Sequence, residues 1–216
     1  MEVEPSLYAA DFANLGEQID SLLGAGARVF HFDVGDGHFI EPITMGPIVL
    51  QSIAGQIHEA GGVIDCHLMV ADPAKHFGAI AHAGGDSVTF HYEAVGDIRS
   101  VVQAARQHEL EVGIAFKPAT RVEDVVPLAQ DVDLVLCMSI EPGYSGQQFL
   151  EGSLERIQWT RYNLPPHIQV QVDGGIGEEN IRSVYEAGAN LLVSASAIFS
   201  REDLPRSYRR LVQALA

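Results

Sequence analysis

Short apolar runs alternate with longer amphipathic segments along the chain, which predicts a repeated strand–helix unit. Strands are predicted at 7–10, 28–33, 63–69, 87–91, 111–116, 133–137, 168–172 and 191–194. Helices are predicted at 15–25, 47–60, 73–83, 98–109, 123–129, 149–162, 179–187 and 204–215. Eight such units favour an α/β fold in which helices surround a closed parallel sheet, so we predict a (β/α)8 TIM barrel as a single domain over residues 1–216.

The charge balance excludes several classes of partner. The formal net charge is -16, from 13 basic and 29 acidic residues, and such a chain repels nucleic acid and acidic membranes. We therefore expect no nucleic-acid or membrane partner. The sequence shows neither an apolar run of transmembrane length nor a basic-then-apolar leader, so we expect a soluble, cytoplasmic protein. Cys66 and Cys137 lie in apolar runs and are expected to be buried free thiols.

The stretch from His31 to Phe39 is the first candidate for chemistry. His31 and Asp33 alternate onto one face of a predicted strand, which then breaks at Gly35–Gly37. Two such side chains are close enough to hold one metal ion. Taken alone, the pair is better explained as a surface-facing His-x-Asp on an amphipathic strand, because isolated motif matches are weak evidence.

The predicted barrel changes that interpretation, because active sites of this fold lie at the C-terminal ends of the strands. There the third strand supplies His67 and the seventh supplies Asp173, so both can meet His31 and Asp33. Mixed imidazole and carboxylate ligands suit Zn, Fe(II), Mn or Co better than Ca or Mg. We therefore predict one divalent metal ion at this rim. His91 alone is better explained as a satisfied core or rim residue.

Small residues after the last three strands predict a phosphate site. Loops after strands 7 and 8 are where such barrels bind phosphate, through backbone amides. Because the acidic chain repels a phosphate at long range, this site has to be built locally. The candidate residues are Gly143, Tyr144, Ser145, Gly146, Gly174, Gly175, Ala195 and Ser196.

Two carboxylates on one metal beside a phosphate site predict proton transfer at a carbon next to a carbonyl. The metal would stabilise an enediolate. One carboxylate would remove the proton and the other would return it from the opposite face, which inverts the stereocentre. Strands 2 and 7 lie far apart around the ring, so Asp33 and Asp173 can face a substrate from opposite sides.

At this point the chain resembles the ribulose-phosphate 3-epimerase family over nearly its whole length. Several motifs in the right order are far more specific than any one of them. The matching stretches are Pro5–Leu7, Ala10–Phe12, His31–Asp33, Asp36–Phe39, Asp65–Val70, Lys117–Pro118, Met138 with Glu141–Gly143, Gly146–Gln147, Val172–Gly175 and Ser194–Ile198.

The resemblance implies a metal-dependent isomerase that epimerises ketose phosphates at carbon 3, with ribulose 5-phosphate and xylulose 5-phosphate as the first pair to test. It implies that the small-molecule sugar phosphate is the partner and that copies of the chain form a homo-oligomer. It assigns the metal to His31, Asp33, His67 and Asp173, with Asp33 and Asp173 as the catalytic acid/base pair. Ser6 and His67 would contact substrate, and Met69 and Met138 would cap it.

The chain departs from the family pattern around the sugar. Gly35 stands where the family has methionine and is expected to open space above the metal. Tyr8 replaces an aliphatic residue, and Pro42 replaces an asparagine. Ser145 and Ala195 replace glycines of the phosphate loops, so Ala195 must have a backbone angle open to other residues. These changes leave a hexulose or tetrulose phosphate open as the substrate.

Two other hypotheses belong to different classes. A sugar-phosphate lyase or decarboxylase on the same barrel would want a lysine near the reacting carbon. The only lysines are Lys75, in a predicted helix, and Lys117, just past the fifth strand. A catalytically silent sugar-phosphate binder is the third hypothesis, and the intact predicted ligand set argues against it.

Overall fold

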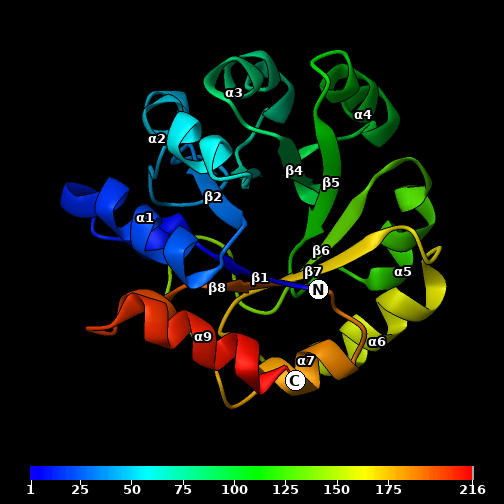
Figure 1. Cartoon of the computed structure of the whole chain (residues 1–216). Coiled ribbons are helices and arrows are strands. Elements are labelled where there is room, and N and C mark those ends of the chain that lie inside the picture. The colour runs from blue at the N-terminus through cyan, green and yellow to red at the C-terminus, as the bar shows by residue number, and fades with distance from the viewer. Residues whose placement is uncertain (216) are drawn as a thin grey trace.

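Parallel strands form a ring with helices packed around its outside, as Figure 1 shows. The computed structural model describes residues 1–215. Over this range the sheet has eight strands in the order β1-β8-β7-β6-β5-β4-β3-β2. The strands are β1 (Glu2–Pro5), β2 (Val29–Gly35), β3 (Val63–Met69), β4 (Ser87–His91), β5 (Glu111–Phe116), β6 (Leu134–Met138), β7 (Gln169–Asp173) and β8 (Leu191–Ser194). The predicted (β/α)8 barrel is confirmed.

The ring closes between its first two strands. β1 pairs with β8 over its whole length, from Glu2 opposite Leu191 to Pro5 opposite Ser194. On its other side, a parallel bridge joins Ser6 to His31 of β2. The closing bridge therefore includes His31, one of the predicted metal ligands.

The helices cover the ring with their apolar faces. The α-helices are α1 (Leu15–Ala25), α2 (Pro47–Glu59), α3 (Phe77–Ala83), α4 (Ile98–Arg106), α5 (Val122–Val125), α6 (Ser153–Asn163), α7 (Ile181–Glu186), α8 (Ser196–Phe199) and α9 (Leu204–Ala214). Short 3₁₀ turns occur at Leu7–Ala9, Phe12–Asn14, Pro73–Lys75, Tyr92–Ala94 and Val126–Asp131. In α1, for example, Ile19 and Leu22 are fully buried three residues apart, as an amphipathic helix requires.

The first predicted strand is wrong. Residues 7–9 form a 3₁₀ turn, and the strand is Glu2–Pro5. Its sequence alternates Glu and Val, and Glu4 is fully buried where it accepts a hydrogen bond from Gln171. A strand whose inward residue is a glutamate has no apolar run to reveal it.

Several predicted helices are also shorter than expected. The segment 149–162 becomes helical only at Ser153, because Gly152 has a left-handed backbone with φ of 83°. The segment 73–83 is divided into a 3₁₀ turn and α3, and 123–129 into α5 and a second 3₁₀ turn. The loops that remain follow the C-terminal ends of the strands, where the candidate site lies.

Two smaller predictions can be compared with the described residues. Cys66 and Cys137 are buried free thiols, as expected. Within residues 1–215, every helix is too short or too polar to cross a lipid bilayer.

Candidate active site

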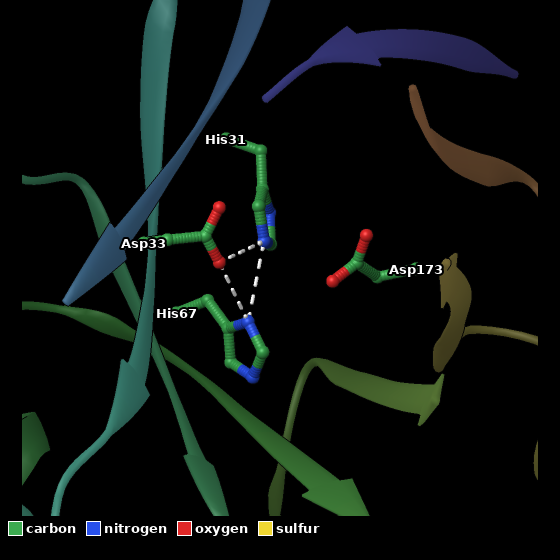
Figure 2. Close-up of side chains that lie close together, drawn as sticks. All are labelled: His31, Asp33, His67 and Asp173. Carbon is green, nitrogen blue, oxygen red and sulfur yellow. Dashed lines mark hydrogen bonds and ion pairs between the residues drawn. The ribbon is translucent and has the colours of Figure 1, made fainter. Parts of the chain in front are cut away.

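Four predicted metal ligands converge at the C-terminal end of the barrel. His31 and Asp33 come from β2, His67 from β3 and Asp173 from β7. Figure 2 shows the first three side chains gathered together, with the Asp173 carboxylate facing them across a gap. One nitrogen or oxygen atom of each residue lies within 4.8 Å of those of the other three. The fold therefore brings together the complete set that the sequence predicts.

The spacing of these atoms fits a first-row divalent cation. His31 Nε2 lies 3.3 Å from Asp33 Oδ1 and 3.4 Å from His67 Nδ1, and His67 Nδ1 lies 3.0 Å from Asp33 Oδ1. Ligands at about 2.0–2.2 Å from a metal ion lie roughly 3.0–3.6 Å from one another in tetrahedral or octahedral geometry. These three side chains are thus already at metal-binding separations.

Neighbouring side chains fix the orientation of these groups. Asp65 Oδ2 lies 3.0 Å from His31 Nδ1, and Asp65 in turn accepts a hydrogen bond of 2.6 Å from the Ser87 hydroxyl. A neutral His31 that donates from Nδ1 to Asp65 directs the lone pair of Nε2 toward the cluster. The Ser6 hydroxyl donates to Asp33 Oδ2 at 2.8 Å, which leaves Oδ1 turned toward the two imidazoles.

The two predicted catalytic aspartates differ in their electrostatics. Burial opposes the charge of Asp33, but His31 and His67 outweigh it and hold the pKa of Asp33 well below its usual range. Burial raises the pKa of Asp173 to about 6. The charge of His31 opposes this rise, and the charge of Asp33 adds to it. The surroundings thus favour an ionised Asp33 and make Asp173 the easier of the two to protonate.

The carboxylates around His31 favour its protonated form, and a cation would compete with that proton. Burial disfavours its charged form, but the carboxylates of Asp33 and Asp65 outweigh burial and raise the pKa of His31 well above its usual value. A cation attracted by the same carboxylates competes with this proton. The donor set therefore fits a metal ion, and binding of the ion should release a proton.

Beneath the four ligands lies a layer of buried polar side chains. Gln171 donates to Glu4 Oε2 at 2.6 Å and to Asp65 Oδ2 at 2.8 Å. Burial and the charge of Asp65 raise the pKa of Glu4 to about 8, so this carboxyl is largely neutral at pH 7. Through its hydrogen bond to Asp65, Gln171 helps to fix the carboxylate that orients His31. Glu4 and Gln171 are absent from the residues predicted from sequence, because their contact joins positions 167 residues apart.

A pocket opens directly above the ligands. It is lined by Ser6, Tyr8, Asp33, Met69, Met138, Ile140, Pro142, Gly143, Tyr144, Ser145, Gly146, Asp173, Gly174, Gly175, Ile176, Val193, Ala195 and Ser196. All the predicted substrate-binding residues except His67 line it, and His67 lies fully buried among the ligands below. The apolar lining residues Ile140, Ile176 and Val193 were missed, because nothing in the sequence separates them from core positions.

The glycine loops after β6 and β7 need left-handed backbone. The φ angles are 129° at Gly143, 124° at Gly174 and 65° at Gly175. Ala195 has φ of -109°, an angle open to any residue, as its departure from glycine requires. At these three glycine positions the loops adopt a backbone that other residues rarely take, and this backbone lies close to the pocket.

Replacing Gly175 by Ala is expected to lower the free energy of unfolding by about 2–4 kcal/mol. An added Cβ would overlap the backbone nitrogen of Phe149 and lie 2.9 Å from its Cα, in a left-handed conformation. The matched control is Gly24→Ala in α1, where a Cβ has open space and should stabilise the chain by roughly 0.5–1 kcal/mol. Urea denaturation compares the two variants, and equal stability would contradict the role given to Gly175.

The prediction that Gly35 opens space above the metal is wrong. A Cβ built on Gly35 would lie 2.6 Å from Ile40 Cδ1 and 3.0 Å from the Pro42 carbonyl oxygen. The loop after β2 therefore folds in and fills the volume that a larger side chain would take, and Ile40 is itself buried. Figure 1 places this loop between β2 and α2.

The loops after β2 and β6 meet over the pocket. The Tyr144 hydroxyl donates to Glu41 Oε2 at 3.2 Å, although the two residues are 103 positions apart. Tyr8 lines the same pocket as Tyr144. Among the described residues that line the pocket, none is a lysine or an arginine. Lys75 instead pairs with exposed Asp72, and the Lys117 ammonium lies 4.1 Å from the centre of the Phe39 ring.

A ring of eight parallel strands with imidazole and carboxylate groups meeting at its C-terminal end defines a (β/α)8-barrel enzyme. The family model described as the ribulose-phosphate 3 epimerase family matches residues 2–199. The chain belongs to this family, and it is therefore an isomerase of the epimerase type.

Named relatives agree with this assignment. Ribulose-phosphate 3-epimerase of Candida glabrata is 36% identical over 93% of this chain and 87% of its own length. The Escherichia coli K12 enzyme of the same name is 34% identical over 99% of this chain and 93% of its own length. Among solved structures, 3-hexulose-6-phosphate synthase from Salmonella typhimurium superposes with a TM-score of 0.75 at 17% identity, covering 100% of this chain and 98% of the other. That likeness shows the barrel fold alone.

Proposed function

We propose that this chain is a metal-dependent 3-epimerase that interconverts ribulose 5-phosphate and xylulose 5-phosphate. One observation carries the proposal: Asp33 and Asp173 come from β2 and β7 and reach the same pocket from opposite sides (Figure 2). A stereocentre inverts when one carboxylate removes a proton from one face and another supplies a proton to the other face.

The electrostatics support an assignment of roles to the two carboxylates. Asp33 is held ionised by its imidazole neighbours and suits the base, whereas Asp173 has a raised pKa and suits the acid. In the direction in which Asp33 is the base, Asp33 takes the proton from carbon 3, and the electron pair of that C–H bond moves toward carbon 2 to give an enediolate. Asp173 then donates its proton to the opposite face of carbon 3, and the reverse reaction exchanges the two roles.

The predicted ligands His31, Asp33, His67 and Asp173 would hold one divalent cation, with Zn, Fe(II), Mn and Co as the ions that suit them. When bound, such a cation supplies the Lewis acidity that stabilises negative charge on the carbonyl oxygen of the substrate. Met69 and Met138 are almost fully buried at the pocket, so they exclude water from the enediolate.

The phosphate group is proposed to bind at the glycine loops. Gly143–Gly146, Gly174–Gly175 and Ala195–Ser196 line one side of the pocket. Backbone N–H groups suit this task in a chain with a net charge of -16, because they bind a phosphate without a basic field. Ser6, which donates to Asp33, would contact the sugar.

The other substrates and classes have less support. A lyase or decarboxylase would need a lysine in the pocket, and the Lys117 ammonium lies over Phe39 instead. A hexulose or tetrulose phosphate stays an alternative because Tyr8 and Tyr144 line the pocket. A cytoplasmic location is proposed from the rice relative named as the cytoplasmic isoform, and the homo-oligomer stays a prediction from the resemblance.

Turnover of four- to six-carbon ketose phosphates in D₂O tests the proposal. We expect the purified protein to interconvert ribulose 5-phosphate and xylulose 5-phosphate faster than any other pair, with one solvent deuterium entering carbon 3. NMR of the products and metal analysis of the same preparation measure both claims. An absence of exchange on every ketose phosphate would contradict the proposal, and preferred turnover of a hexulose or tetrulose phosphate would change the substrate.

A further inference from the structure

Behind His67, the buried side chain of His91 and the partly exposed side chain of Glu93 lead away from the metal ligands. His67 Nε2 lies 2.9 Å from His91 Nε2, and His91 Nδ1 lies 3.2 Å from Glu93 Oε2. Both imidazoles are fully buried, and their rings stack with centroids 5.0 Å apart. In the register of β3 and β4, His67 pairs with Thr89, so His91 lies two residues farther along the same inward face.

The far end of this row is anchored by backbone. Glu93 Oε1 accepts a hydrogen bond of 2.8 Å from the backbone N–H of Lys117 and another from the Thr120 hydroxyl. Phe39 packs against His91 with ring centroids 4.8 Å apart, and Lys117 covers Phe39. The segments around Phe39 and Lys117 therefore hold the His91–Glu93 pair in place, although they lie in different loops.

With a cation in place of a proton between His67 Nδ1 and Asp33 Oδ1, the hydrogen bonds allow one arrangement of protons along the row. A carboxylate only accepts, so Glu93 requires a proton on His91 Nδ1. Neutral His91 then accepts at Nε2, so the proton of this contact belongs to His67 Nε2. Neutral His67 consequently has its lone pair on Nδ1, the atom that lies 3.0 Å from Asp33 Oδ1 and faces the metal ligands.

We propose that His91 and Glu93 are positioning residues for the metal centre, which hold His67 in the tautomer that presents Nδ1 as a ligand. The inference rests on the metal site of the proposed function. His31 is oriented by one carboxylate, Asp65, in direct contact. His67 is oriented through an intervening imidazole, so its tautomer depends on both members of the pair.

Glu93→Gln is the decisive variant, because the side chain keeps its size. The backbone N–H of Lys117 can only donate, so the carbonyl oxygen of the new amide is expected to stay at the Oε1 position and its N–H₂ group to face His91. That reverses every hydrogen bond in the row and places a proton on His67 Nδ1, where it competes with the cation. Outer partners of metal-bound histidines typically change affinity about 10–100-fold, so we expect a loss of this size for Zn²⁺ and Co²⁺.

The experiment measures chelator competition for Zn²⁺ and Co²⁺, and ¹⁵N NMR of labelled histidines in the metal-free and Zn²⁺-loaded proteins, without substrate. Zn²⁺-loaded wild type should carry the proton of His67 on Nε2. In the metal-free proteins Asp33 and Glu93 favour opposite tautomers of His67, so the variant should shift its proton toward Nδ1 relative to wild type. The matched control Glu186→Gln, at an exposed pair with Arg182 on α7, should leave affinity and tautomer unchanged. If Glu93→Gln keeps the wild-type tautomer of His67 and the wild-type metal affinity, this inference is wrong, whereas the proposed function still stands. A wild-type protein that binds neither metal would overturn the metal site of the proposed function and this inference together.

Discussion

Asp173→Asn is expected to reduce interconversion of the two pentulose phosphates by about 10²–10⁴-fold, the usual contribution of a general acid or base. The amide cannot return a proton to the second face of carbon 3. Asp33, held in place by Ser6, should still exchange the carbon-3 hydrogen of the one epimer that presents it to Asp33. NMR in D₂O should thus show deuterium entering one epimer without formation of the other.

The control for this variant is Asp72→Asn, an exposed aspartate paired with Lys75, which should retain wild-type rates. Metal content has to be measured on the same samples, because Asp173 is also a predicted ligand. Asp33→Asn should show the mirror result, with exchange confined to the other epimer. Epimerisation by Asp173→Asn at the wild-type rate would refute the assignment of the acid.

Removal of the metal with a chelator is expected to lower kcat by at least about 10³-fold, because a Lewis acid contributes several kcal/mol to the transition state. The barrel should remain folded but become less stable. At a free cation concentration of about 100 Kd, binding stabilises by roughly 2.7 kcal/mol, which for a chain of this size is a Tm shift of roughly 5–11 °C.

Selective restoration distinguishes a specific site from general ionic effects. Zn²⁺, Co²⁺, Mn²⁺ or Fe²⁺ should restore activity and Tm together, whereas Ca²⁺ should restore neither, since two imidazoles are poor ligands for it. Full activity in a preparation shown to be metal-free would disprove the cation's part in the reaction.

Most strands and helices could be predicted because their apolar patterns are local. β2 to β8 were placed within one or two residues, since each begins or ends near a glycine or a charged residue. β1 could not be found, because its inward residue is Glu4, whose hydrogen-bond partner Gln171 lies 167 positions away. Such a pairing has no signal in the neighbouring residues.

The metal ligands could be predicted for a related reason. His31, Asp33, His67 and Asp173 all lie near the C-terminal ends of predicted strands, and the barrel brings these ends together. His91 also ends a strand, but judged singly it is an ordinary core histidine. Its importance depends on the 2.9 Å contact with His67 and on Glu93, which three-dimensional packing alone establishes. Likewise, the filling of the space beside Gly35 by Ile40 depends on a loop path that no short motif determines.

The pairing of β1 with β8 has a consequence for biosynthesis. Glu2–Pro5 leave the ribosome well before Leu191–Ser194, the residues with which they pair. At about 5–20 residues per second, the opening strand waits roughly 10–40 s for its partner. Until β8 is made, β1 and β7 lack the strand that lies between them, and a nascent chain that stalls before β8 leaves Asp33 in an unfinished pocket. Such a truncated product should be a good substrate for chaperones and proteases.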